Sequence, residues 1–238
     1  LSIDQGAFRN MLKLTAYGAS VDANRPLLNG VLLSFKAGKL SVVATDSRRL
    51  ALVEHEVEFP ADAEMDLIVP LKTVEELLRT LAETGTVKIL ATAKQIAFEF
   101  DRILIVSKLV EGTYPNFRQV IPQANGERVA MERETLLTAV RRTSQLVIDA
   151  VSGVKLTFTK NRLEILATAP EIGEARETMD VKYKGPDIAI SFNPAFLMDP
   201  LKALTTDEVY LDLLDDTSPG VLRSSISFVY VLMPIRVS

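Results

Sequence analysis

The side chains that most often carry acid–base or nucleophilic chemistry are nearly absent from this sequence. Its 238 residues include one histidine, His55, and no cysteine, which excludes disulfides, cysteine nucleophiles and cysteine metal ligands within the chain. His55 lies in an alternating run of residues that predicts a β-strand. We therefore expect a solvent-facing strand histidine and not a member of a catalytic triad.

Carboxylates are the remaining candidates for chemistry. Asp46 together with Asp215 or Asp216 would suit a carboxylate-dependent hydrolase, but Thr217-Ser218-Pro219-Gly220 follows the pair, and turn formation explains such acidic residues better. No metal-ligand spacing, glycine-rich phosphate loop or nucleophile elbow is present. The sequence thus predicts no catalytic residues, no metal and no cofactor.

Composition narrows the class of protein. Hydrophobic residues are 47% and charged residues 24%, which is typical of a soluble globular chain. No basic-then-apolar leader is present and no apolar run approaches the roughly 20 residues of a membrane span, so we expect a cytoplasmic protein. The absence of an initiator Met before Leu1 leads us to expect an upstream piece. The net charge of −4 opposes simple nucleic-acid binding unless basic groups are segregated.

The chain contains an internal repeat. Residues 30–35 reappear 123 residues later as residues 153–158, and both copies read as β-hairpins of alternating apolar residues with a short turn. In the first copy Val31, Leu33 and Phe35 are expected to share one face of a strand. Further strands are expected to close each copy, at 87–90, 96–100 and 103–107 in the first and at 209–213 and 228–232 in the second.

Each predicted hairpin follows a segment with helical spacing of apolar residues, and a second such segment lies in the middle of each copy. Asp4 and Asn193 stand where N-caps are expected, and Pro194 suits a first helical position. The apolar stripes of the four predicted helices are Phe8, Met11, Leu12 and Thr15; Val74, Leu77, Leu78 and Leu81; Leu136, Leu137 and Val140; and Leu197, Leu201 and Leu204.

We therefore predict an α+β fold made of two tandem copies of one domain, each with two helices on one face of antiparallel sheets. A polar, turn-rich segment at 122–127 makes a suitable linker. The predicted domains are 1–122 and 123–238.

Four motifs in order make the chain similar to a known family, the beta subunit of bacterial DNA polymerase III or beta sliding clamp. The resemblance covers that family's middle and C-terminal domains, from one end of the chain to the other. The motifs are Arg25-x-x-Leu28-Asn29-Gly30, Ala44-Thr45-Asp46-Ser47-Arg48-Arg49-Leu50-Ala51, Ser107 to Gly112 with Tyr114-Pro115-Asn116-Phe117, and Leu232-Met233-Pro234-Ile235-Arg236.

The resemblance implies tandem DNA-clamp domains and a processivity factor that does no chemistry. In the family, three-domain subunits pair head-to-tail into a homodimeric ring, whose helices face double-stranded DNA without sequence preference. Polymerase, clamp loader and repair proteins bind through short linear motifs. Because the resemblance includes no first domain, we expect this piece alone not to close the ring.

The resemblance also implies a hydrophobic groove between the two domains for motifs with Gln-Leu and Leu-Phe elements. Aliphatic and Met side chains make such a slot adaptable, and polar groups fix the peptide amides. The residues that match the family's groove are Leu28, Thr45, Ser47, Arg48, Arg49, Leu50, Pro115, Val120, Asn193, Phe196, Val231, Leu232, Met233, Pro234, Ile235 and Arg236.

Some of these positions depart from the family pattern. Ser47 stands where Gly is customary, Arg48 where His is common, and Leu27 where an aromatic residue is frequent, while Gln119 replaces a residue that is basic in some members. These departures bear on peptide preference and not on the presence of a groove.

Basic residues on the predicted helices reconcile the acidic total charge with a role on DNA. Sparse phosphate contacts give weak, salt-sensitive and sequence-independent attraction, which suits sliding. A solvated helix face is the ordinary alternative, and a peptide-binding adaptor without a DNA role is the alternative function. The residues expected to face DNA are Arg9, Lys13, Asn24, Arg25, Lys72, Arg79, Arg141 and Arg142.

Overall fold

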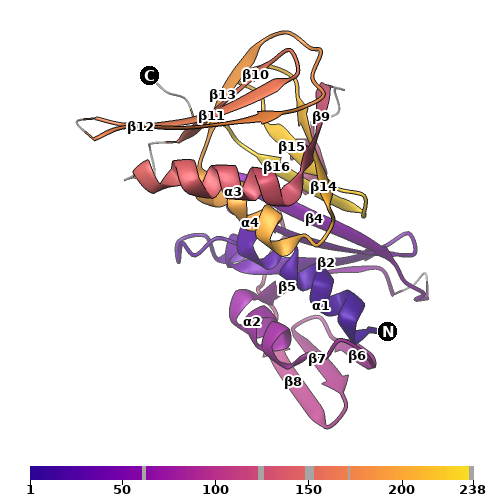
Figure 1. Ribbon diagram of the computed structural model, residues 1–238. Coiled ribbons are helices and arrows are strands. Elements are labelled where there is room, and N and C mark those ends of the chain that lie inside the picture. The colour runs from indigo at the N-terminus through magenta and orange to yellow at the C-terminus, as the bar shows by residue number, and fades with distance from the viewer. Residues whose placement is uncertain (61–62, 123–125, 148–152, 171, 236–238) are drawn as a thin grey trace. The chain divides into compact units, whose positions relative to one another are not determined.

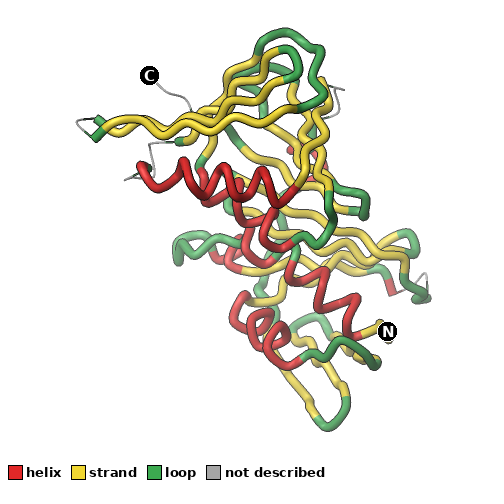
Figure 2. The backbone as a smooth tube through the Cα atoms, viewed as in Figure 1, coloured by secondary structure: helices red, strands yellow, loops and turns green. Residues whose placement is uncertain are grey.

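The computed structural model describes residues 1–60, 63–122, 126–147, 153–170 and 172–235 (Figure 1). The chain divides into two compact units, Leu1–Arg118 and Gln119–Ser238. Within the described residues, both units have the same order of elements: a strand, a helix, four strands, a helix and three strands (Figure 2). The tandem repeat inferred from the sequence is therefore confirmed.

The first unit contains two antiparallel sheets, with strand orders β1-β6-β7-β8 and β5-β2-β3-β4. Short 3-10 turns, η1 (Ala16–Gly18) and η2 (Pro26–Asn29), precede β2. The helices and strands are β1 (Ser2–Asp4), α1 (Gln5–Lys13), β2 (Gly30–Lys36), β3 (Lys39–Thr45), β4 (Arg49–Glu56), β5 (Met65–Pro70), α2 (Leu71–Thr80), β6 (Thr86–Ala91), β7 (Gln95–Phe100) and β8 (Ile103–Lys108).

The second unit repeats this arrangement, with strand orders β9-β14-β15-β16 and β13-β10-β11-β12. Each strand thus pairs as its counterpart does in the first unit. The elements are β9 (Glu127–Glu132), α3 (Arg133–Thr143), η5 (Ser144–Leu146), β10 (Val154–Thr159), β11 (Arg162–Ala169), β12 (Gly173–Asp180), β13 (Ile188–Phe192), α4 (Pro194–Ala203), β14 (Glu208–Leu213), β15 (Gly220–Arg223) and β16 (Phe228–Leu232); η4 (Phe117–Val120) spans the division between the units.

The helix starts follow the predicted caps. The Asp4 carboxylate accepts a hydrogen bond from the Ala7 N–H at 2.8 Å at the start of α1. The Asn193 side chain accepts one from Ala195 N–H at 2.9 Å at the start of α4. Both contacts satisfy N–H groups that have no partner inside a helix, so these two predictions are confirmed.

Each unit has its own apolar core, in which the amphipathic helices contribute their apolar faces. Phe8 of α1 stacks on Phe98 of β7 with ring centroids 5.9 Å apart. In the second unit the ring centroids of Phe158 of β10 and Tyr183 lie 5.6 Å apart. His55 is exposed at the end of β4, as predicted.

Strand β2 differs from the expectation of one buried face. Val31, Leu33 and Phe35 are buried, but Leu32 and Ser34 are buried as well. Ser34 Oγ donates to Asp66 Oδ1 of β5 at 2.6 Å, which satisfies its hydroxyl inside the structure. The alternating pattern therefore identified the strand but underestimated its burial.

Candidate functional site

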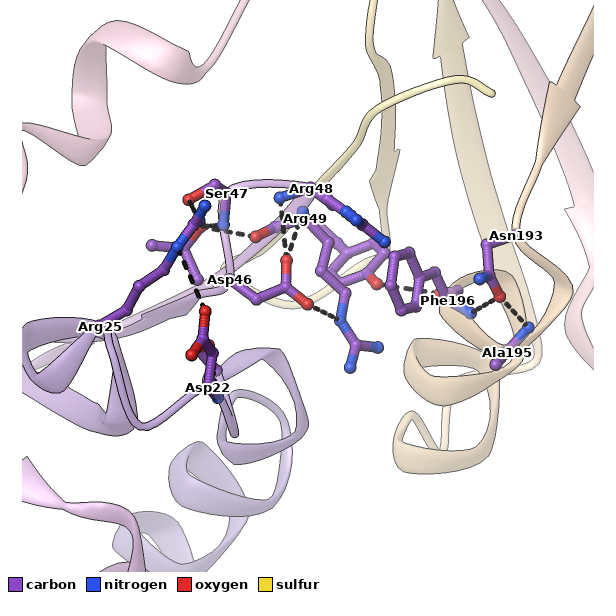
Figure 3. A network of polar contacts seen from close by, with 12 residues as sticks. Asp22, Arg25, Asp46, Ser47, Arg48, Arg49, Asn193, Ala195 and Phe196 are labelled. Atoms are coloured by element: carbon purple, nitrogen blue, oxygen red, sulfur yellow. Dashed lines mark hydrogen bonds and ion pairs between the residues drawn. The ribbon is translucent and has the colours of Figure 1, made fainter. Parts of the chain in front are cut away.

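The loop between β3 and β4 is a tight turn organised by one carboxylate (Figure 3). Asp46 accepts hydrogen bonds from the backbone N–H groups of Arg48 at 2.9 Å and Arg49 at 3.0 Å, and from Arg49 Nε at 3.1 Å. Thr45 Oγ1 donates to the Arg49 carbonyl at 2.6 Å and accepts from the Ser47 N–H at 3.2 Å. Asp and Thr offer such side-chain bonds to turns, so this segment's own sequence fixes its shape.

Ser47 occupies an unusual backbone conformation at the tip of this turn. Its φ angle is +77°, in the left-handed region that favours glycine. Its hydroxyl accepts a hydrogen bond from Arg25 Nη1 at 2.8 Å, and Arg25 Nε lies 3.7 Å from Asp22 Oδ2. The turn after β3 is thereby connected to the loop before η2 (Figure 3).

The predicted groove residues of the first unit differ in exposure. Leu28 and Leu50 are buried, at 8% and 2% exposure, whereas Ser47, Arg48 and Pro115 are exposed. The polar residues of the turn are therefore at the surface, whereas the two leucines belong to the buried core.

Tyr114 lies under the same turn and was missing from the residues predicted for the site. Burial raises the pKa of its hydroxyl above the ordinary value, and the negative charge of Asp46 acts in the same direction. Asp46 and Tyr114 both lie inside quoted motifs. The available signal for the turn was the Asp46-Ser47 pair, two residue types that favour turns, between two apolar runs.

The predicted groove residues of the second unit lie at the start of α4 and around the end of β16. Phe196 is partly exposed, and its carbonyl accepts a hydrogen bond from Tyr230 Oη at 2.9 Å. Val231 and Leu232 are buried at 1% exposure each, whereas Met233 is 42% exposed.

The segment after β16 makes a backbone contact with β13. The Ile235 N–H donates to the Ser191 carbonyl at 2.7 Å. Pro234 and Ile235 are partly exposed, as is Asn193, and Val120 is 48% exposed. Arg236 lies outside the described residues.

The residues predicted to face DNA, all basic except Asn24, are exposed on α1, α2, α3 and the loop before η2, apart from Arg9. Arg9 is partly exposed and bridges the two helices of its unit, with Nε donating to the Leu78 carbonyl at 3.3 Å and Nη1 2.5 Å from Glu83 Oε1. Exposed ion pairs of this kind add little stability. The exposed members are Lys13, Asn24, Arg25, Lys72, Arg79, Arg141 and Arg142.

Arg133, the first residue of α3, does not belong to the exposed basic residues of this helix. The guanidinium instead donates to the Thr206 carbonyl at 2.7 Å and to the Leu201 carbonyl at 2.9 Å, with its side chain 13% exposed. Arg133 therefore satisfies carbonyl groups at and beyond the end of α4, which is a structural role.

The carboxylate alternative receives no geometric support. Asp215 accepts hydrogen bonds from the N–H groups of Thr217 and Ser218 at 2.8 and 2.5 Å. These bonds, with that from the Ser218 hydroxyl, lower the pKa of Asp215 to about 2. The residue organises a turn, as its sequence context predicted. Within the described part of the chain, no three His, Asp or Glu side chains are grouped to hold a metal ion.

Two family models match nearly the whole chain. The DNA polymerase III beta subunit central domain matches residues 2–116, and the C-terminal domain of the same subunit matches residues 118–236. The beta sliding clamp of Chlamydia pneumoniae is 32% identical over 235 residues, with 99% of this chain and 64% of the relative covered. That of Pseudomonas aeruginosa is 33% identical over 238 residues and is covered to 65%. The chain thus spans about two thirds of these relatives.

Solved structures give the same result. A crystal structure of the Pseudomonas aeruginosa sliding clamp matches with a TM-score of 0.95 at 33% identity, covering 100% of this chain and 66% of that one. A clamp from Bartonella birtlesii bound to griselimycin matches with a TM-score of 0.94 at 32% identity, with the same coverage. The predicted α+β fold with two clamp domains is therefore confirmed. Among the described helices, none has the length and apolar character needed to cross a bilayer.

Proposed function

The chain belongs to the DNA polymerase III beta subunit family, the beta sliding clamps, and we propose that it supplies the middle and C-terminal domains of a processivity factor. We place these domains at 1–122 and 123–238. The assembled clamp is a homodimeric ring around double-stranded DNA in the cytoplasm, and it performs no chemistry. Its activity is to keep other proteins on their template, through binding surfaces alone.

One observation carries this proposal: two successive domain models of one subunit match the chain in the family's order, with residue 117 alone between them. The same repeat of elements and sheet orders in both units agrees with it. A single short motif would be weak support, because isolated motifs recur by chance.

We propose that residues of both units bind the linear motifs of polymerase, clamp loader and repair proteins. Exposed Met233 and partly exposed Phe196 supply adaptable apolar surface. The turn that begins at Thr45 supplies polar groups that fix an extended peptide. Buried Leu28, Leu50, Val231 and Leu232 and partly exposed Pro234 and Ile235 support these surfaces. The griselimycin bound by the Bartonella birtlesii clamp agrees with ligand binding in this family.

We propose that α1, α2 and α3 face DNA through their basic residues. Lys13, Lys72 and Arg141 are exposed and make no ion pair within the described residues. Such groups attract phosphates without reading sequence and release bound counterions. Asn24 and Arg25 add to this surface from the loop before η2.

Calorimetric titration of a Gln-Leu-Ala-Leu-Phe peptide tests the function. We expect binding by the chain, and a loss of at least about tenfold in Met233→Ala because a buried apolar contact of 1.4 kcal/mol corresponds to that factor. Ile226→Ala is the matched control, since Ile226 is also 42% exposed and lies in the same unit. Equal losses in both variants, or no binding by the chain, would overturn the proposal.

A further inference from the structure

Three large apolar side chains are exposed on one face of the sheet β1-β6-β7-β8 in the first unit. Helix α1 lies against the opposite face of this sheet (Figure 1), where its Phe8 stacks on Phe98 of β7. On the face that turns away from α1, Leu104 and Val106 of β8 are 63% and 58% exposed, and Leu90 of β6 is 44% exposed. Exposed apolar residues that are grouped in this way mark an interaction surface, whereas single ones do not.

The strand register brings these residues into one row across the sheet. Leu90 is paired with Ala97 of β7, and Ala97 is paired with Val106 of β8. Leu104 lies on the same face as Val106, because side chains two residues apart in a strand point the same way. The short side chain of Ala97, which is partly exposed, leaves room between the larger Leu90 and Val106. These four residues form the β6–β8 patch.

More positive than negative charge surrounds the β6–β8 patch. The charged residues of β6, β7 and β8 are Lys88, Lys108 and Glu99, and Lys94 lies in the turn that joins β6 to β7. Lys88 and Glu99 form an exposed pair at 3.9 Å, which is weak and screened. Lys94 and Lys108 are exposed and make no ion pair within the described residues. A partner with acidic residues beside its apolar surface would therefore be attracted here.

Neither a second copy of the chain nor DNA is complementary to the β6–β8 patch. In the described part of the chain, helices α1 to α4 carry none of the exposed large apolar residues. A second copy docked face to face would bring the same positive charges against one another. Duplex DNA would engage the lysines through its phosphates and would leave the apolar row without a partner. The charge and the apolar row together favour a different protein.

We propose that the β6–β8 patch binds an amphipathic helix of a partner protein, with apolar residues of the helix on the patch and acidic residues along its flanks. Leu90 and Val106 are two strands apart, which is about 10 Å, and two turns of an α-helix span about 11 Å. A large apolar side chain between these two turns then fits over Ala97. The patch shares no residue with the linear-motif site or with the basic residues proposed to face DNA, so it adds a separate binding surface.

Two synthetic helices test the inference. Each is about 14 residues long and carries a side-chain cross-link, because isolated helices of this length are marginal in water. Both present Leu at positions i, i+4 and i+7, and their flanking residues are Glu in one probe and Gln in the other. Fluorescence anisotropy of the labelled probes should show saturable binding of the Glu probe to the chain. The Gln probe should bind at least about threefold more weakly, and added salt should reduce that difference.

Variants assign the binding to residues. Leu104→Thr should weaken binding of the Glu probe about fivefold or more, and Val106→Thr should act in the same direction, while Thr keeps the preference for a strand. Ile103→Thr is the matched control, because Ile103 precedes Leu104 on β8 and points to the other face. Lys108→Gln should reduce the preference for the Glu probe, whereas Lys202→Gln, at an exposed position of α4, should retain it. Thermal melting of each variant reports whether its unit stays folded.

Three results would overturn the inference, and none of them bears on the proposed clamp function. The first is the absence of saturable binding of either probe, or an equal loss in Leu104→Thr and Ile103→Thr. The second is a parent chain that sediments as a dimer and a Val106→Thr chain that sediments as a monomer, because the patch would then serve a second copy. The third is weaker binding of a short duplex by Lys108→Gln with unchanged binding of both probes, because the patch would then serve DNA.

Discussion

Asp212 on β14 binds Arg128 on β9 through two hydrogen bonds, at 2.6 and 2.9 Å. Arg223 on β15 donates to the same carboxylate at 3.0 Å. One acidic side chain, 17% exposed, thus connects three neighbouring strands of a sheet. Burial raises the pKa of Asp212, but the hydrogen bonds from Arg128 and Arg223 outweigh it and place the pKa below its ordinary value.

Because this pKa is lowered by folding, the stabilisation is present above the unfolded-state pKa and is lost as the pH falls through the folded-state value. Asp212→Asn should lower the free energy of unfolding by about 1.5 kcal/mol at pH 7, the scale of a hydrogen bond to a charged group. Urea denaturation at pH 7 and in acid measures it. Asp216→Asn, at a neighbouring exposed position, is the control. The assignment would be contradicted by an equal loss of unfolding free energy in both variants, or by a difference between Asp212→Asn and the parent chain that stays the same in acid.

Ser47→Gly should give a more stable chain than Ser47→Ala, by about 1 kcal/mol. Both variants lose the bond to Arg25, but only glycine adopts a φ of +77° without steric cost. The same pair of substitutions at Ser144, whose φ is −65°, should rank in the opposite order. Thermal denaturation measures both pairs, and the same ranking at the two positions would contradict the explanation.

Gly6→Ala should destabilise the chain although alanine is the better helix former. A Cβ on Gly6 in α1 would lie 2.3 Å from the carbonyl oxygen of Glu83, which is backbone and cannot turn aside. We expect a loss of about 1 to 3 kcal/mol, typical of overpacking. Asn10→Ala on the exposed face of the same helix should instead be neutral or slightly stabilising. A Gly6→Ala chain as stable as the parent would show that α1 can shift freely.

Arg141→Gln should weaken binding of a short duplex and reduce the slope of log affinity against log salt by about 1, because one phosphate contact is lost. Arg102→Gln is the control, because it removes an exposed positive charge from the turn between β7 and β8 and not from a helix. Fluorescence anisotropy over a salt series measures the slopes. Equal slopes for Arg141→Gln and the parent, with peptide binding intact, would favour a peptide-binding adaptor without a DNA role.

Local signals in the sequence predicted the elements that local interactions decide. Asp4 and Asn193 predicted helix starts because an N-cap needs only the next three residues. Alternation found the two hairpins and strands β4, β6, β7, β8, β14 and β16. It did not predict β1, β5, β9, β12, β13 or β15, and the exposed and polar residues of β12 give little apolar signal.

Features that depend on distant residues were not predictable in this way. Nothing near Arg133 in the sequence indicates that its acceptors are the carbonyl groups of Leu201 and Thr206, 68 and 73 residues away. The burial of Ser34 depends likewise on Asp66 in another strand. For the candidate site, the family motifs named the turn from Thr45 to Leu50. The Arg25–Ser47 contact required the structure, because Arg25 precedes a different element.

Methyl-group NMR on the chain, with Met233 and the isoleucine residues labelled, tests the central claim most directly. On titration with a Gln-Leu-Ala-Leu-Phe peptide, the Met233 methyl signal should shift and saturate, while Ile226, equally exposed, and Ile103 on β8 should not move. Saturable shifts at Ile103 without a change at Met233 would place binding elsewhere. A spectrum unchanged by excess peptide would contradict the clamp function assigned to these two domains.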